Sequence, residues 1–255
     1  MTVSFGKCKL CMGVKDLVDS HALPDSAYRA LFHDGDGKVI LLSNKLDTPT
    51  QYTSDSGGTF LFCADCEKKL NERYDQYGIG VFKGIKTKVT RSDTGITFSG
   101  LDHQRFRMFF VSLVWRMEIS QHKYFGAVEF PVALRNQFHQ HIRNNTILPR
   151  SRMRVALYRL RNTINVEGFS HEELRNPVVA PFITRHNSIL FVFYGFAIEC
   201  FLLKMKSKHS NNKSILGNTG SVYFSPYTEI FGIPEILEVF KASFQREQDG
   251  NTKIS

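Results

Sequence analysis

Four cysteines have the residue type and spacing of a structural zinc site. Cys8 and Cys11 form one C-x2-C pair, and Cys63 and Cys66 form a second. The x2 spacing lets a tight turn present two sulfurs to one metal, and two pairs supply the four thiolates that close a tetrahedral zinc site. Because a site closed by four sulfurs leaves no coordination position for a substrate, we expect this zinc to stabilise the fold. Any catalysis must then come from other side chains.

The remaining cysteine, Cys200, lies in the longest apolar run of the chain, which predicts a small buried side chain. That run is shorter than the roughly 20 apolar residues of a membrane-spanning helix, and the N-terminus lacks a signal-peptide pattern. We therefore expect a cytoplasmic protein that makes no membrane contact. Cysteines in a reducing compartment bind metal or stay free rather than form a disulfide framework.

The elements that must position the zinc ligands can be predicted from local sequence. Residues 17–24, LVDSHALP, should be extended up to the proline, and residues 25–32 should form a short capped helix. Residues 58–63, GTFLFC, predict a strand that leads into the second cysteine pair, and residues 66–77 predict a helix that begins there. A zinc knuckle, strands and a second knuckle that opens a helix make a treble-clef arrangement.

These residues also carry a resemblance to a known family. The pattern is C-x2-C, then eight residues and Ser20-His21-x-x-Pro24, then Gly57-Gly58, then LFCADCE at the start of a helix. It is similar to the zinc-containing HNH endonucleases over residues 8–70. A closer likeness is to bacterial proteins with C-x2-C…SHxxP…C-x2-CE and a later helix ending in SLxWR. In this chain that helix reads FFVSLVWRMEIS.

The resemblance implies a metal-dependent endonuclease that hydrolyses phosphodiester bonds in DNA or RNA. It implies that His21 is the general base and that Mg²⁺ or Mn²⁺ lies between the positions of Ser20 and Glu67. Both of these residues differ from the family, because a serine hydroxyl binds a hard cation weakly and the usual helix residue is His or Asn. Glu67 alone could hold Mg²⁺ together with water and phosphate oxygens. Small bacterial proteins of this type often act in phage defence or on mobile elements.

Each of these residues also has a purely structural interpretation. His21 could donate to a backbone carbonyl and fix the turn before Pro24, and Glu67 could favour the first turn of its own helix through the helix dipole. The competing hypothesis is therefore a catalytically inactive, zinc-stabilised adaptor that binds nucleic acid or a protein. A third hypothesis is a purely structural zinc, with the function in the C-terminal part.

The positive charge of the chain is concentrated in one block. The net charge is +9, and residues 101–162 hold eleven basic and three acidic residues, a net +8. Within this block Arg150, Arg152 and Arg154 alternate, and a strand would direct all three to one face. Guanidinium groups in such a row suit phosphate oxygens, which predicts nucleic acid as the partner. An exposed strand face without a ligand gives the same pattern.

The rest of the chain predicts an α+β fold with a zinc-binding module over residues 1–90 and a basic α+β domain over 91–255. Residues 76–100 suggest short strands or a linker. Residues 101–120 carry an apolar stripe at helical spacing. Arg116 lies near the edge of this stripe, and its position is equally consistent with a buried ion pair and with a contact to phosphate. Further predicted elements are a helix over 131–145, a strand over 150–162, two strands around Gly195 and a closing helix over 234–247.

Overall fold

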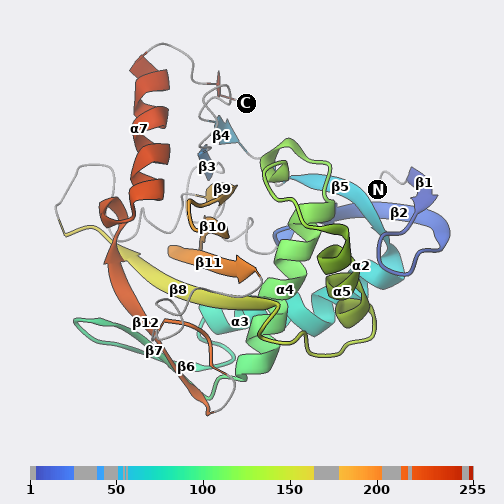
Figure 1. Ribbon diagram of the computed structural model, residues 1–255, viewed down its shortest axis with the longest axis horizontal. Helices are drawn as coiled ribbons and strands as arrows, with labels where there is room; N and C mark the ends of the chain where they lie inside the picture. The colour runs from blue at the N-terminus through green and yellow to red at the C-terminus, as the bar shows by residue number, and fades with distance from the viewer. Residues whose placement is uncertain are drawn as a thin grey trace.

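The fold mixes helices and strands, as the sequence predicts. The structure is a computed structural model that describes residues 4–25, 39–42, 51–53, 55, 57–163, 178–202, 214–217, 220–248 and 253–254. Figure 1 shows a small sheet with packed helices toward one end of the molecule and a large twisted sheet toward the other. The helix expected over residues 25–32 lies outside the described residues from position 26 onward.

The small sheet holds the N-terminal strands and is antiparallel, in the order β1-β2-β5. Its strands are β1 (Ser4–Lys7), β2 (Val14–His21) and β5 (Gly58–Cys63). Helix α2 (Ala64–Leu70) begins directly after β5. The strand over 58–63 and the helix that opens at the second cysteine pair are therefore confirmed. The extended segment expected over residues 17–24 is a strand only as far as His21, and the chain bends at residues 22 and 23 before Pro24.

One helical segment continues from α2 and corrects a prediction. A π turn, η1 (Asn71–Asp75), joins α2 to α3 (Gln76–Phe82), although residues 76–82 were expected to be strand or linker. The helix is stable there because Tyr77, Ile79 and Val81 are buried, and such packing outweighs the low helix propensity of the glycines between them. Strands β6 (Lys88–Arg91) and β7 (Gly95–Ser99) then follow as expected.

The large sheet has ten strands in the order β13-β4-β3-β9-β10-β11-β8-β12-β7-β6. Most neighbours are antiparallel, while β3 with β9, β12 with β8, and β13 with β4 are parallel. Its remaining strands are β3 (Val39–Leu42), β4 (Gln51–Thr53), β8 (Met153–Arg161), β9 (Val178–Ile183), β10 (Ser188–Phe193), β11 (Phe196–Leu202), β12 (Val222–Glu229) and β13 (Lys253–Ile254). Strands β3 and β4 lie within the first ninety residues and β6 ends at residue 91, so the sheet joins the early part of the chain to the later part.

The two faces of this sheet belong to different hydrophobic clusters. Along β10, Ile189 and Phe191 belong to the main core, whereas Leu190 and Val192 belong to a second cluster with Ile236 and other residues of helix α7 (Pro234–Gln248). This alternation follows from the two-residue period of a strand. The tight turn between β10 and β11 contains Tyr194 and Gly195, both with positive φ, which confirms the predicted pair of strands.

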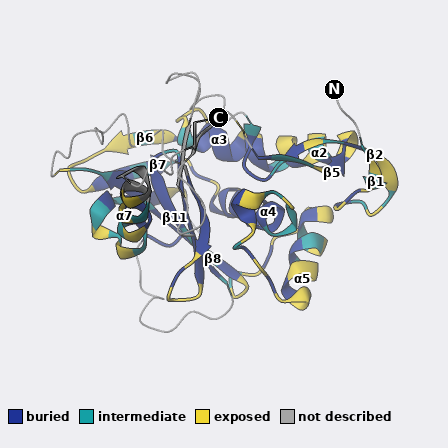
Figure 2. Ribbon diagram, turned by 90° about the horizontal axis from the view of Figure 1, so that it is seen from above, coloured by how far each residue is buried: buried dark blue, intermediate teal, exposed yellow. Residues whose placement is uncertain are grey.

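Helix α4 (His103–Ile119) is the central element of the main core. The sequence predicted one apolar stripe, but every side chain from Phe106 to Met117 is buried, so the helix is enclosed on all sides (Figure 2). Helix α5 (Val132–Arg143) packs beside it and keeps an exposed outer face. A short 3-10 turn, η2 (Lys123–Phe125), connects the two, and a second, η4 (Ile230–Gly232), precedes α7.

Candidate metal centre and active site

The four predicted zinc ligands lie together. Cys8 follows β1, Cys11 lies in the turn before β2, Cys63 ends β5, and Cys66 is in the first turn of α2. Their sulfur atoms are all within 4.8 Å of one another. Tetrahedral zinc with bonds of about 2.3 Å separates its sulfurs by about 3.8 Å, so a small contraction around a metal satisfies the geometry. This cluster could hold a metal ion such as zinc.

Local backbone hydrogen bonds shape the first knuckle. The Cys8 N–H donates to the carbonyl of Gly13 at 2.9 Å, and the Met12 N–H donates to the carbonyl of Cys8 at 3.0 Å. The Cys63 N–H in turn donates to Cys8 Sγ at 3.4 Å. Although burial opposes ionisation, this bond and the N–H groups of Cys11 and Leu10 lower the pKa of Cys8 to about 7. Burial and the neighbouring cysteines raise the pKa of Cys66. Thiolate is the form that binds zinc, so Cys8 is ready to bind a metal, whereas Cys66 would lose its proton only as the metal binds.

No second group of three or more His, Cys, Asp or Glu ligand atoms lies this close together in the part of the chain that the structure describes. A second metal site built by several protein ligands is therefore not formed by the described residues. Cys200 is fully buried in β11, remote in sequence and role from the four ligands, which agrees with its prediction as a core side chain.

Ser20 and His21 end strand β2 and point to opposite sides of it, because successive side chains alternate along a strand. Ser20 is fully buried. Its hydroxyl donates to the carbonyl of Val18 at 3.1 Å and accepts from the Phe62 N–H at 3.3 Å. The His21 side chain is 14% exposed, and its Nε2 lies 4.0 Å from Oδ2 of Asp19. Thus Ser20 joins β2 to β5, while His21 keeps an accessible edge.

Glu67 follows the zinc ligand Cys66 and lies in the first turn of α2. Burial raises the pKa of Glu67, while the positive charge of Arg116 and the neighbouring Ser20 hydroxyl act in the opposite direction. Its Oε2 atom is buried and has no hydrogen-bond partner among the described residues. Ser20 and Glu67, the two positions named from the sequence, therefore lie beside each other at the end of β2 and the start of α2.

Two residues of this site were not assigned to it from the sequence. The fully buried guanidinium of Arg116 in α4 makes a bidentate ion pair with Asp75 in the π turn, with 2.9 Å between Nη1 and Oδ2 and 2.5 Å between Nη2 and Oδ1. Arg116 Nη1 also donates to the carbonyl of His21 at 3.1 Å. Of the two alternatives for Arg116, the ion pair is the one present. π turns recur at functional sites, but the sequence carried no signal for this one.

The three arginines of the basic block do not form a single strand row. Only Arg154 lies within β8, whereas Arg150 and Arg152 lie in the turn before it. Arg150 Nη2 donates to the carbonyl of Leu216 at 3.0 Å, and Arg152 is exposed. The buried Arg107 of α4 donates to the carbonyls of Leu148 and Met153 on either side of this turn.

The arginine side chains near this turn repel one another. Burial, and then the charge of Arg150, lower the pKa of Arg107 to about 10. Burial and the charge of Arg154 lower the pKa of Arg150 as well. The Nε atoms of Arg107 and Arg150 are buried without an acceptor in the described structure. The positive charge gathered at this turn would favour a nearby anion.

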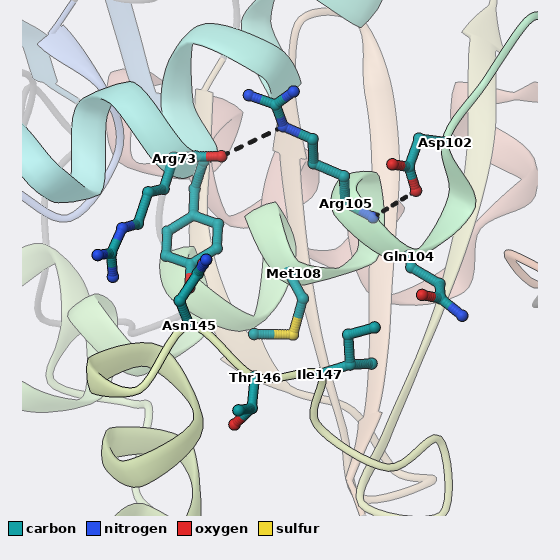
Figure 3. Close-up of a pocket in the computed structure, with 9 residues that line it drawn as sticks. Arg73, Asp102, Gln104, Arg105, Met108, Asn145, Thr146 and Ile147 are labelled. Atoms are coloured by element: carbon teal, nitrogen blue, oxygen red, sulfur yellow. Dashed lines mark hydrogen bonds between the residues drawn. The ribbon is translucent and has the colours of Figure 1, made fainter.

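A cavity of about 290 Å³ opens between the π turn, the start of α4 and the loop after α5 (Figure 3). Arg73 and Arg105 lie along one rim in this view, opposite Thr146 and Ile147. Arg105 is held by the Tyr77 ring, 4.6 Å from its centroid, and its Nε donates to the carbonyl of Arg73 at 3.4 Å. The rim therefore carries further guanidinium groups outside the predicted set.

Comparison with protein-family models, with curated proteins and with solved structures found no match. Among the described helices, none has the length and apolar character needed to cross a membrane.

Proposed function

We propose that the chain is a metal-dependent nuclease with an HNH-like treble-clef module that hydrolyses phosphodiester bonds in nucleic acid. The observation that carries this proposal is the buried, unpartnered Oε2 atom of Glu67, one residue beyond a zinc ligand and beside Ser20. The arrangement around the four cysteines supports it, because the knuckle leads into β2, β2 pairs with β5, and β5 leads into α2, although β3 and β4 of the large sheet lie between β2 and β5 in the sequence. His21 ends the first of these strands, at the position where the resemblance expects the general base.

In this proposal His21 takes a proton from the attacking water. The water oxygen forms a bond to phosphorus, the bond between phosphorus and the leaving oxygen breaks, and the proton passes to the imidazole. A general base of this kind contributes a rate factor of about 10² to 10⁴. Asp19, whose Oδ2 lies 4.0 Å from His21 Nε2, helps to orient the ring. Arg116 fixes the backbone of His21 through the carbonyl and so positions the base.

Mg²⁺ or Mn²⁺ would be held by Glu67, with Ser20 beside it. The residues fit such an ion in part: Glu67 offers one oxygen without a donor, while Ser20 already uses its hydroxyl within the sheet. One carboxylate, waters and substrate phosphate are enough for Mg²⁺ in many sites. The ion would stabilise the negative charge that develops on the phosphate and its leaving oxygen.

Nucleic acid would be bound through the basic groups around the site. Arg150, Arg152 and Arg154 supply charge at the turn before β8, and Arg73 and Arg105 supply it at the cavity rim. Contacts to phosphate release counterions, so affinity should fall steeply as the salt concentration rises. We name DNA as the first substrate to test and RNA as the second.

One specific observation favours a second function, a zinc-stabilised adaptor that binds nucleic acid or a protein without cutting. Ser20 is fully buried with its hydroxyl occupied, and the positive charge of Arg116 lies close enough to Glu67 to lower the pKa of its carboxyl group against the effect of burial. A fixed positive charge next to the proposed ion weakens the attraction for a divalent cation. The adaptor predicts salt-sensitive binding and no cleavage.

The test is plasmid nicking by purified, zinc-loaded protein with Mg²⁺ or Mn²⁺. Wild type would be compared with His21→Ala and with the control His186→Ala, which removes an exposed imidazole from the loop between β9 and β10. We expect cleavage by wild type and by the control, and a loss of about 100-fold or more in His21→Ala. Equal rates in all three proteins would overturn the role of His21. Binding without cleavage in all three would favour the adaptor.

A further inference from the structure

A second cavity lies beside the zinc knuckle, outside the site described above. Its volume is about 320 Å³, it is open to solvent, and it is lined by the knuckle, the C-terminal end of α4 and residues 135–139 of α5. The residues that line it are Lys9, Met12, Trp115, Glu118, Ile119, Arg135, Asn136 and His139. Its volume lies near the lower limit of pockets that bind small organic molecules, so we asked what ligand its walls would accept.

The carboxylate of Glu118 is the polar group of the cavity that most limits which ligands could bind there. Its side chain is 2% exposed, and its Oε1 atom accepts from Nε and Nη2 of Arg135. Its other oxygen, Oε2, is buried and accepts no hydrogen bond from any residue described. Leaving a buried carboxylate oxygen without a donor is costly. The cavity therefore lacks one hydrogen-bond donor, and a ligand can supply it.

The other walls favour a flat ring. Trp115 forms the floor of the cavity and is itself buried, stacked on Phe62 with 5.7 Å between ring centroids, and the partly exposed ring of His139 lies 5.9 Å from it. His139 is itself fixed by a contact of 2.8 Å between its Nε2 and the carbonyl of Leu10. Met12 adds a thioether that is 44% exposed. Aromatic and thioether walls of this kind bind planar rings by dispersion and stacking.

The net charge of the residues that line the cavity favours some planar ligands over others. Lys9 and Arg135 are positive and Glu118 is the only acid among the lining residues, so the walls carry a net positive charge. A cationic ligand such as a lysine or arginine side chain is disfavoured by these charges. A ligand with an anionic group at the rim and a neutral ring that donates one hydrogen bond satisfies both Glu118 and the basic residues.

We propose that this cavity binds one unstacked nucleobase that carries an exocyclic amino group, as part of the nucleic acid that the chain recognises. The amino group donates to Glu118 Oε2, the ring lies between Met12 and His139 above the buried Trp115, and the phosphate faces Lys9 and Arg135. The inference rests on the proposed function in so far as nucleic acid is the ligand, but it does not require cleavage. Aromatic side chains bind unpaired bases in this way in single-strand recognition.

The intrinsic fluorescence of the protein can detect binding in this cavity, because Trp115, the only tryptophan in the sequence, is one of its lining residues. Tryptophan fluorescence would be followed during titration with adenosine 5′-monophosphate and with purine riboside 5′-monophosphate. These nucleotides differ only in the exocyclic amino group. We expect a saturable change with the adenosine nucleotide and at least roughly tenfold weaker binding of the purine riboside nucleotide, because only the former donates to the carboxylate. Equal affinities, or no response to either nucleotide, would overturn the proposal.

Glu118→Gln tests the acceptor directly, and Glu129→Gln is the matched control, since Glu129 is exposed and does not line the cavity. Zinc content and melting temperature would be checked in both. Glu118→Gln should lose the preference for the adenosine nucleotide, whereas Glu129→Gln should keep it. A preference retained in Glu118→Gln would overturn the role of this oxygen. Plasmid cleavage without any nucleotide response would reject the base pocket alone, whereas a nucleotide preference without cleavage would support the pocket and reject the nuclease.

Discussion

The guanidinium of Arg116 contacts two parts of the chain that are far apart in sequence. It pairs with the carboxylate of Asp75 and donates to the carbonyl of His21. Both charges of the ion pair are buried, so each depends on the other for compensation. The same guanidinium influences Glu67, where its charge opposes the effect of burial on the pKa. Arg116 therefore couples the stability of the core to the geometry of the candidate site.

Asp75→Asn should be strongly destabilising, because it leaves a buried guanidinium without its counter-charge. Breaking one side of a buried ion pair costs about 3–5 kcal/mol, which urea unfolding would measure. Glu72→Gln is the control on the same helical segment, since the exposed Lys68–Glu72 pair spans 3.9 Å and is worth at most about 0.5 kcal/mol. Similar free energies of unfolding for the two variants would show that Asp75 and Arg116 are not a buried pair.

Removal of a zinc ligand should remove both the metal and the stability of the small sheet. Cys63 is one of the four thiolates and is also the last residue of β5, the strand that leads into α2. Cys63→Ser removes that thiolate, so zinc content and melting temperature should fall together. Cys200→Ala, a change in the buried strand β11, should retain zinc in full. Chelation of wild type should reproduce the loss of stability. Full zinc retention in Cys63→Ser, measured by elemental analysis, would contradict the four-cysteine site.

At the scale of elements, two glycines of α3 lie very close to neighbouring side chains. Gly78 in α3 lies so near α4 that a Cβ added there would be 2.3 Å from Cγ of Phe109, a buried ring. A Cβ at Gly80, on the same helix, would instead meet Cγ of the flexible Lys86 side chain at 2.6 Å. The Phe109 ring is packed in the core and cannot move aside easily, whereas the Lys86 side chain can adopt another rotamer.

Gly78→Ala and Gly80→Ala should therefore have opposite effects. Both gain up to about 1 kcal/mol in helix propensity, but Gly78→Ala also overpacks the contact with Phe109, at a cost of about 1–3 kcal/mol. We expect Gly78→Ala to lower the free energy of unfolding and Gly80→Ala to leave it unchanged or raise it. If chemical denaturation gives the same sign for both, α3 does not pack against α4 as closely as described.

Local patterns were enough to predict the elements around the zinc ligands and the central helix. Strand β2, strand β5, the start of α2 and α4 all follow from short-range signals of spacing, alternation and helical period. The position of Asp75 could not be predicted, since eight residues along a regular α-helix place it roughly 80° away from Glu67. The π turn between them changes that phase, and no sequence rule anticipates such a turn.

At the scale of the whole molecule, the strand order of the large sheet could not be predicted from local sequence patterns. Strand β3 pairs in parallel with β9, and β12 pairs in parallel with β8, so neighbours in space come from distant parts of the chain. The basic block was visible as composition, yet its arginines divide between a turn, strand β8 and the two helices α4 and α5. Net charge specifies the chemistry of a partner, but only folding shows which charges share a surface.

Helix α4 links the parts of the molecule that the proposals use. Arg107 near its start holds the turn with Arg150, Arg116 pairs with Asp75, and Glu118 near its end lines the cavity beside the zinc knuckle. These side chains are mostly buried, so α4 acts as a rigid support rather than as a contact surface. A groove that binds nucleic acid would therefore be built around this helix, with exposed groups on the segments that it positions.

The most direct measurement for the central claim is chemical rescue of His21→Ala. Hydrolysis of a labelled oligonucleotide would be followed with Mn²⁺ in zinc-loaded protein, with and without added imidazole. If His21 is the general base, the variant should be at least about 100-fold slower than wild type, and imidazole should restore a measurable part of its rate while leaving wild type unchanged. A wild-type rate in the variant, or a loss that imidazole does not restore at all, would contradict the account.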